Sequence, residues 1–108
     1  MNREISLEKA CKTIAINNKA ALLKLTGYTG IPDRMLLKNG KVIFIEFKDK
    51  KGKIGTAQLA WKKQLEKLGF RSEIVYNKEE FMKIMGGLNN GTNETSRKST
   101  GGIQNKAK

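Results

Sequence analysis

The pair Asn39-Gly40 constrains the fold of this chain more than any other feature of its sequence. Both central residues of a two-residue type I′ turn need a positive φ angle, and Asn followed by Gly tolerates that conformation well. Runs of strand length that are rich in apolar and β-branched residues flank the pair, at residues 35–37 and 42–45. The pattern therefore predicts a β-hairpin with a two-residue loop.

A loop of this length also fixes the register of the two strands. With Lys38 opposite Lys41, Asp33 lies opposite Glu46. Because side chains alternate along a strand, Glu46 and Lys48 share one face of the sheet, and Asp33 points to the same face. Facing residues lie about 4.5–5.5 Å apart at Cβ, where like charges repel each other. A divalent cation between the two carboxylates would offset this repulsion, so the hairpin predicts a hydrolytic metal site.

A simpler interpretation of these charges stays open. Charged residues at strand ends are commonly solvated, and Glu46 could pair with Lys48 or Arg34. The strand before Glu46 is nevertheless apolar on both faces, with Val42 and Phe44 on the acidic face and Ile43, Ile45 and Phe47 on the other. Such a strand is typical of the centre of a sheet, where a charged residue without a function is unexpected.

Charge and composition narrow the classes of function. Lys and Arg number 22 against 10 Asp and Glu, and the net charge of +12 favours a polyanionic partner, above all nucleic acid. Cys11 is the single cysteine and there is no histidine, which excludes intramolecular disulfides, Cys or His zinc clusters and Ser-His-Asp chemistry. A catalytic metal would therefore be held by oxygen atoms, which suits Mg²⁺ or Mn²⁺.

The chain of 108 residues predicts one domain, with a compact part at residues 1–85 and a disordered, mildly basic tail at residues 86–108. The tail is rich in Gly, Asn, Ser, Thr and Lys and carries few bulky apolar residues. No apolar run approaches the ~18 residues of a membrane span, and the N-terminus lacks an apolar signal core. We expect a cytoplasmic protein with no membrane association.

Periodicity and turn signals divide the compact part into alternating elements. Ser6 is a good N-cap, Gly69 a good helix stop, and the stretch at residues 21–26 favours a strand over a helical continuation. The elements are a helix at 7–17, strands at 21–26, 35–37 and 42–45, a helix at 56–68, a strand at 70–76 and a helix at 78–85. This αβββαβα order predicts an α/β fold with a mixed sheet of about four strands flanked by helices, with Trp61 in the core.

Basic residues near the hairpin are candidate contacts for a nucleic-acid backbone. Lys24 and Arg34 flank the carboxylates and could contact phosphates, although they could also serve only to compensate local charge. The turn after the hairpin adds Lys50, Lys51 and Lys53. On this reading binding depends on shape and charge rather than on base sequence.

Several short motifs resemble the VRR-NUC family of PD-(D/E)xK nucleases, and the resemblance spans residues 8–85. The motifs are Gly30-Ile31-Pro32-Asp33-Arg34, Ile45-Glu46-Phe47-Lys48, Gly52-Lys53-Ile54 followed by Gln58, and Leu65 followed by Gly69-Phe70. The resemblance implies a restriction-endonuclease-like core. Gly55-Thr56 departs from the family pattern, because a Ser-Pro-like helix start is expected there.

The resemblance also implies roles for individual residues. The metal ligands would be Asp33, Glu46, Glu8 and the main-chain carbonyl of Phe47. Lys48 would stabilise the developing negative charge and help position the attacking water, and Gln58 would orient the lysine or the water. Lys24 matches a basic residue on the first strand. Without the resemblance, Glu8 would simply favour the helix dipole, and Glu4 is the fallback for its role.

The implied function is a Mg²⁺- or Mn²⁺-dependent, structure-specific DNA endonuclease. Small stand-alone members of the family, usually viral, resemble homodimeric resolvases of four-way (Holliday) junctions, which would place the chain in a host cytoplasm. A flap or nicking nuclease with the same chemistry remains an alternative. A non-catalytic nucleic-acid-binding protein that keeps the fold is another.

Overall fold

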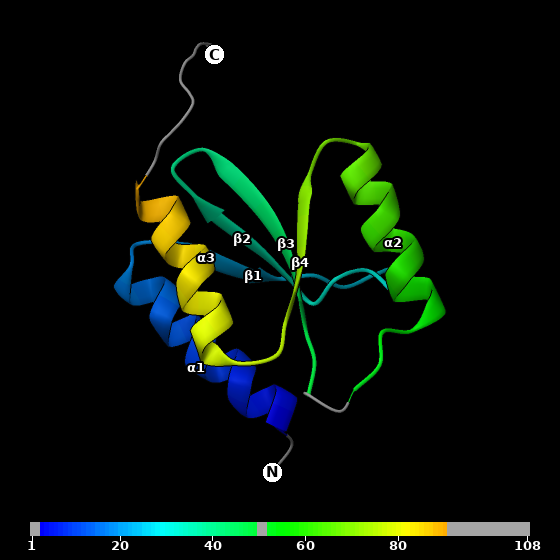
Figure 1. Cartoon of the computed structure of the whole chain (residues 1–108), viewed down its shortest axis with the longest axis horizontal. Coiled ribbons are helices and arrows are strands. Elements are labelled where there is room, and N and C mark those ends of the chain that lie inside the picture. The colour runs from blue at the N-terminus through cyan, green and yellow to red at the C-terminus, as the bar shows by residue number, and fades with distance from the viewer. Residues whose placement is uncertain (1–2, 50–51, 91–108) are drawn as a thin grey trace.

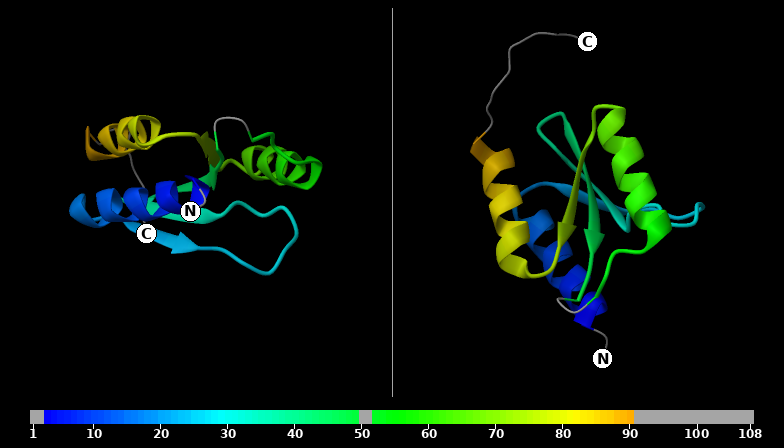
Figure 2. Two further views of the ribbon diagram at one scale, coloured as in Figure 1. Left: turned by 90° about the horizontal axis from the view of Figure 1, so that it is seen from below. Right: turned by 45° about the vertical axis from the view of Figure 1, so that its right-hand side comes forward.

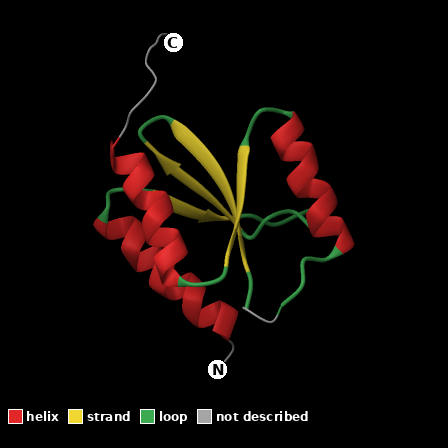
Figure 3. Cartoon of the chain, in the orientation of Figure 1, coloured by secondary structure: helices red, strands yellow, loops and turns green. Residues whose placement is uncertain are grey.

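The computed structural model describes residues 3–49 and 52–90, and the side chains of residues 5–49 and 52–89. Its elements are α1 (Arg3–Asn17), β1 (Ala21–Lys24), β2 (Arg34–Lys38), β3 (Lys41–Phe47), α2 (Thr56–Lys67), β4 (Arg71–Val75) and α3 (Lys78–Asn90). This is the predicted αβββαβα order, and Figure 3 shows its helices and strands. The segment at residues 21–24 is a strand, so the helical alternative for it is wrong.

The strands form one mixed sheet in the order β1-β2-β3-β4. The first two pairs are antiparallel, and β4 returns parallel to β3 after the α2 crossover. In the hairpin Lys38 pairs with Lys41 and Arg34 with Ile45, as the turn predicted. Asn39 and Gly40 have φ angles of 52° and 75°, as a type I′ turn requires.

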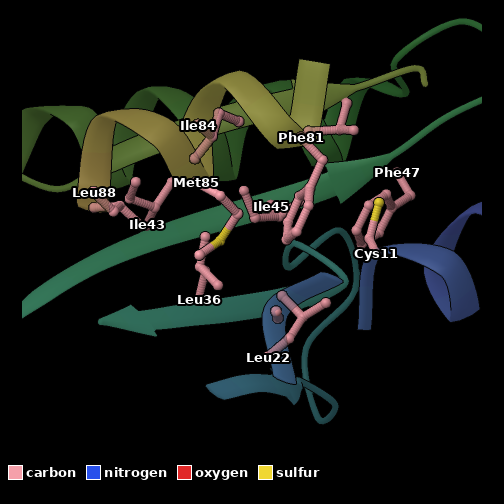
Figure 4. Packing of buried hydrophobic residues seen from close by; sticks show 12 residues of the cluster. Cys11, Leu22, Leu36, Ile43, Ile45, Phe47, Phe81, Ile84, Met85 and Leu88 are labelled. Carbon is pink, nitrogen blue, oxygen red and sulfur yellow. The ribbon is translucent and has the colours of Figure 1, made fainter. Parts of the chain in front are cut away.

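Helices cover both faces of this sheet. Figure 1 shows α1 and α3 together on one side and α2 on the other, and Figure 2 gives two further views of the arrangement. Alternate strand residues point to the α1–α3 side, which we call the core face, and the apolar ones among them are buried there. The buried cluster there comprises Cys11, Ala15, Leu22, Leu36, Ile43, Ile45, Phe47, Val75, Phe81, Ile84, Met85 and Leu88, most of which Figure 4 labels.

The opposite side, the α2 face, is covered more thinly. Leu65 is the buried residue of α2, and the apolar strand residues on this face are partly buried or, at Leu23, exposed. Trp61 does not belong to the buried core, so the prediction that it does is wrong. Its indole instead contacts Tyr28, in the loop between β1 and β2.

Two helix boundaries differ from the predicted ones. The first helix begins at Arg3, before Ser6, because residues 3–6 contain no Pro or Gly to stop it. The last helix continues through Gly86 to Asn90, so the expectation of disorder from Gly86 onward is wrong for these residues. The extra turn is stabilised because Leu88 is buried, 2% exposed, and its carbonyl accepts a hydrogen bond from Asn39 Nδ2 at 2.8 Å.

Residues 91–108 of the predicted tail lie outside the described part of the chain, as do Lys50 and Lys51. None of the helices within residues 3–49 and 52–90 is long and apolar enough to cross a membrane.

Candidate active site

Glu46 is the buried acid of the sheet. It lies between Ile45 and Phe47, which both enter the core face, so its own side chain points to the α2 face. Only 6% of Glu46 is exposed. Burying a carboxylate is costly unless it accepts hydrogen bonds, and Glu46 Oε2 accepts one from Gln58 Nε2 at 2.6 Å. The helix that covers this face therefore supplies a donor to the acid.

Gln58 is itself held by the start of α2. Its Oε1 accepts a hydrogen bond from the main-chain N–H of Gly55, the N-cap residue, at 2.9 Å. Because Oε1 faces an N–H donor and Nε2 faces a carboxylate, both ends of the amide are matched and its orientation is fixed. The Gly55-Thr56 sequence thus starts the helix, and the amide at the third helical position links the helix start to Glu46.

Asp33 closes the open end of the hairpin. Its Oδ2 accepts a hydrogen bond from the main-chain N–H of Phe47 at 2.9 Å, and its carbonyl accepts one from Leu25 at 3.0 Å. Phe47 directly follows Glu46, so the two predicted acids are brought to neighbouring positions at the same end of the sheet.

Hydrogen bonds offset the repulsion between the two carboxylates that the sequence predicted. Asp33 and Glu46 each accept a hydrogen bond from a separate donor, so a cation is not required to make their proximity tolerable. The donor set still suits a hard cation, since carboxylate and carbonyl oxygens are the ligands that Mg²⁺ prefers. The N–H and C=O of one residue point to the same side of a strand, so we expect the Phe47 carbonyl to point toward Asp33.

Lys48 continues β3 beyond its last assigned residue. Its N–H donates to the Val75 carbonyl at 3.0 Å, which extends the parallel pairing, and alternation places its side chain on the same face as Glu46. The stem of the side chain lies over Gly52, where an added Cβ would come within 3.4 Å of Lys48 Cδ. The predicted lysine therefore lies on the same face of the sheet as the buried acid.

Glu8 occupies a different place from the other predicted acids. Its Oε1 lies 3.6 Å from Arg34 Nη2, and the two side chains are only 20% and 15% exposed. Arg34 pairs with Ile45, so it points to the core face, away from Glu46. In the part of the chain that the structure describes, no group of three or more Asp, Glu, Cys or His side chains could hold a metal ion. The side chain of Glu4 lies outside the described residues.

The predicted DNA-contacting residues differ in exposure. Lys24, at the end of β1, and Lys53 are exposed. Arg34 is mostly buried in its ion pair with Glu8, which favours the alternative that it compensates local charge.

Burial raises the pKa of the Cys11 thiol to about 12, so this thiol stays protonated and inert, as expected for a small core residue.

An aromatic pair between the β1–β2 loop and α2 was missed from the sequence. The rings of Tyr28 and Trp61 are 5.8 Å apart between centroids, and Trp61 Nε1 donates to the Thr29 carbonyl at 3.1 Å. The only sequence signal was a tyrosine in the glycine-flanked loop at residues 27–30. That signal did not reveal that the loop packs on α2.

The order and pairing of the elements define an α/β protein with a four-stranded mixed sheet. More particularly, the chain has the fold of a VRR_NUC domain. A solved structure described as "VRR_NUC domain" is similar with a TM-score of 0.72 and 24% sequence identity, over 80% of this chain and 97% of that chain. No family model matches the sequence, and no curated protein matches it either.

Proposed function

We propose that this chain is a metal-dependent endonuclease that hydrolyses phosphodiester bonds in branched DNA. The observation that carries the proposal is the buried Glu46, held by Gln58, with Asp33 and Lys48 at the same end of the sheet. The VRR_NUC fold of the chain supports it.

Asp33, Glu46 and the Phe47 carbonyl would hold Mg²⁺ or Mn²⁺. When bound, the ion would polarise a phosphoryl oxygen and lower the pKa of a bound water. Glu8 remains a proposed acid of the site. Arg34 holds Glu8 on the α1 side of the sheet, the side opposite to that to which Glu46 points.

The chain's own residues would orient and stabilise the reacting groups. The Lys48 ammonium would donate to the phosphoryl oxygens as negative charge develops on them. Gln58 would act as a positioning residue, because it fixes the carboxylate of Glu46 through a hydrogen bond of 2.6 Å.

DNA is the proposed substrate because the chain carries a net charge of +12. Lys24 and Lys53 are exposed, and together with Lys50 and Lys51 they are the proposed phosphate contacts. Contacts of this kind release counterions, so binding should weaken steeply as salt is raised.

We further propose a homodimer that cuts four-way junctions. An apolar band crosses the α2 face from strand to strand, through the paired residues Leu23, Met35 and Phe44 and on to Phe70, whose ring contacts that of Phe44. Leu23 and Phe70, at the two ends of this band, are 45% and 43% exposed. A two-fold partner covering this band would bury apolar surface and place two sites on one junction.

The test is cleavage by purified protein with Mg²⁺ or Mn²⁺ on duplex, flap and four-way DNAs, together with the solution mass. We expect symmetric cuts in four-way DNA by a dimer, and loss of cutting in Lys48→Ala protein. Cutting of flaps by a monomer would establish the alternative nuclease. Binding of DNA without cleavage on any substrate would overturn the nuclease proposal in favour of a non-catalytic binder.

A further inference from the structure

Tyr28 and Trp61, which we call the aromatic pair, form an aromatic surface that the core does not use. Tyr28 is 69% exposed, and Trp61 is only partly buried, on the helix opposite the core face. An aromatic side chain this exposed forgoes the large free energy that its burial would contribute. We propose that the aromatic pair stacks on an unpaired base of branched DNA beside the bond to be cut, an inference that rests on the proposed nuclease function.

The loop that carries Tyr28 is held firmly against α2. Trp61 Nε1 donates to the carbonyl of Thr29, the next residue along. Gly30 has a φ of +83°, and a Cβ on it would lie 2.6 Å from the Cβ of Ala57. Backbone that approaches a helix this closely fixes the loop, so little entropy is lost when a ligand stacks on Tyr28.

The surface beside Trp61 has the character that a base requires. Ala60, Trp61 and Gln64 line an open hollow of about 280 Å³. This volume is slightly below the range of about 300–1,000 Å³ found for drug-sized ligands, so the hollow has room for one base and not for a long peptide segment or a helix. Bases need a flat apolar surface for their faces and polar groups at their edges, and the Gln64 amide is such a group.

The aromatic pair lies next to the candidate active site. Gln58, which binds Glu46, is three residues before Trp61 on α2, and side chains at this spacing are neighbours with Cβ atoms about 5–6 Å apart. The loop that carries Tyr28 ends at Asp33, and Figures 1 and 2 show this loop reaching across to α2. A base stacked here would belong to a nucleotide close to the scissile phosphate.

Among possible occupants, the charge of the chain favours DNA. A net charge of +12 attracts a polyanion, and stacking on aromatic residues is tolerant of base identity. Flaps and gapped branches of DNA carry unpaired bases, and the branch point of a four-way junction interrupts the continuous stacking of its paired bases, whereas an intact duplex keeps its bases paired and stacked. The aromatic pair would therefore select branched over duplex DNA without reading sequence.

Trp61 is the only tryptophan of the chain, so its fluorescence reports on this surface alone. The experiment titrates the full chain, in EDTA to prevent cleavage, with two branched DNAs that differ only in bases or abasic sugars at the unpaired positions. We expect the DNA with bases to quench Trp61 and to bind more tightly. Tyr28→Ala should weaken that binding roughly 5- to 150-fold, the equivalent of ~1–3 kcal/mol for one stacked base.

Two control variants isolate the effect of stacking. Tyr28→Phe keeps the ring and should restore tight binding, and Met82→Ala, an exposed apolar residue of α3 on the other side of the sheet, should bind as the unchanged chain does. Equal binding and quenching by the abasic DNA would overturn the inference. A change in solution mass of Tyr28→Ala protein without DNA would also overturn it, by assigning the surface to contact between copies. If no DNA is cut but the DNA with bases still quenches Trp61 fluorescence, the nuclease proposal is wrong and the aromatic pair is still a base-stacking surface.

Discussion

At the scale of single residues, the candidate site depends on one amide. Gln58 supplies the hydrogen bond of 2.6 Å to Glu46, and Gly55 holds the other end of that amide. Removing a residue that orients a ligand of a metal typically costs 10–100-fold in activity. Gln58→Ala should therefore lower the cleavage rate by about 10–100-fold, measured as single-turnover cutting of branched DNA with Mg²⁺.

The matched control for this change is Glu66→Ala on the exposed side of α2, whose ion pair with Lys62 is a surface contact of small energetic value. It should cut at the unchanged rate. If Gln58→Ala also cuts at the unchanged rate, Glu46 is positioned by something other than this amide.

Asp33 combines a structural contact with a proposed ligand role, and these can be separated. An asparagine at this position keeps an acceptor for the Phe47 N–H but removes the charge. Asp33→Asn should keep a melting temperature within a few degrees of the unchanged chain, yet lose the stabilisation that Mn²⁺ confers. Loss of the fold itself in Asp33→Asn protein would mean that its negative charge, and not only its hydrogen bond, holds the hairpin end.

Some of these residue contacts could be predicted from the sequence and others could not. The register of Asp33 and Glu46 was predictable because a two-residue turn leaves only one way to pair the strands. The ion pair of Glu8 with Arg34 was not predictable, since it depends on how α1 packs across the sheet. The position of Trp61 was missed for the same reason, because helical periodicity does not reveal which loop will cover a side chain.

At the scale of elements, the loop between β1 and β2 is fixed by its contact with α2. Gly30 needs its positive φ of 83°, and any Cβ would overlap Ala57. Gly30→Ala should destabilise the chain by about 2 kcal/mol or more, measured by urea unfolding. Gly27 in the same loop also has a positive φ, but nothing lies within 4 Å of its Cβ position, so Gly27→Ala should cost less. Equal losses for the two variants would contradict the close packing of this loop.

The last turn of α3 is part of the folded unit. Leu88 is 2% exposed and packs in the core cluster, so Leu88→Ala should cost about 2–5 kcal/mol of the free energy of unfolding. Met82→Ala on the exposed side of the same helix should cost well under 1 kcal/mol. A small effect of Leu88→Ala on the free energy of unfolding would mean that residues 86–90 do not belong to the folded unit.

The last turn of α3 was not predicted because Gly86 and Gly87 are poor helix formers. The tertiary contact of Leu88 outweighs their low helix propensity.

At the scale of the whole molecule, the α/β order and the mixed sheet followed from turn signals and periodicity. Both signals are local, and the parallel return of β4 follows from the length of the α2 crossover. The sequence did not reveal that helices cover the two faces of the sheet unequally. The alternation of side chains along a strand shows which residues share a face, but it does not show which helix covers that face. That unevenness leaves the apolar band and the aromatic pair on the α2 face, the same face to which Glu46 points.

The proposed nuclease activity requires that the acids at the end of β3 hold a divalent metal ion. The most direct test is Mn²⁺ binding by isothermal titration calorimetry to the unchanged chain and to Glu46→Gln protein, with folding of each checked by circular dichroism. We predict binding by the unchanged chain and at least a tenfold loss of affinity in folded Glu46→Gln protein. Equal Mn²⁺ affinity in the two proteins, or no binding by the unchanged chain, would contradict the claim.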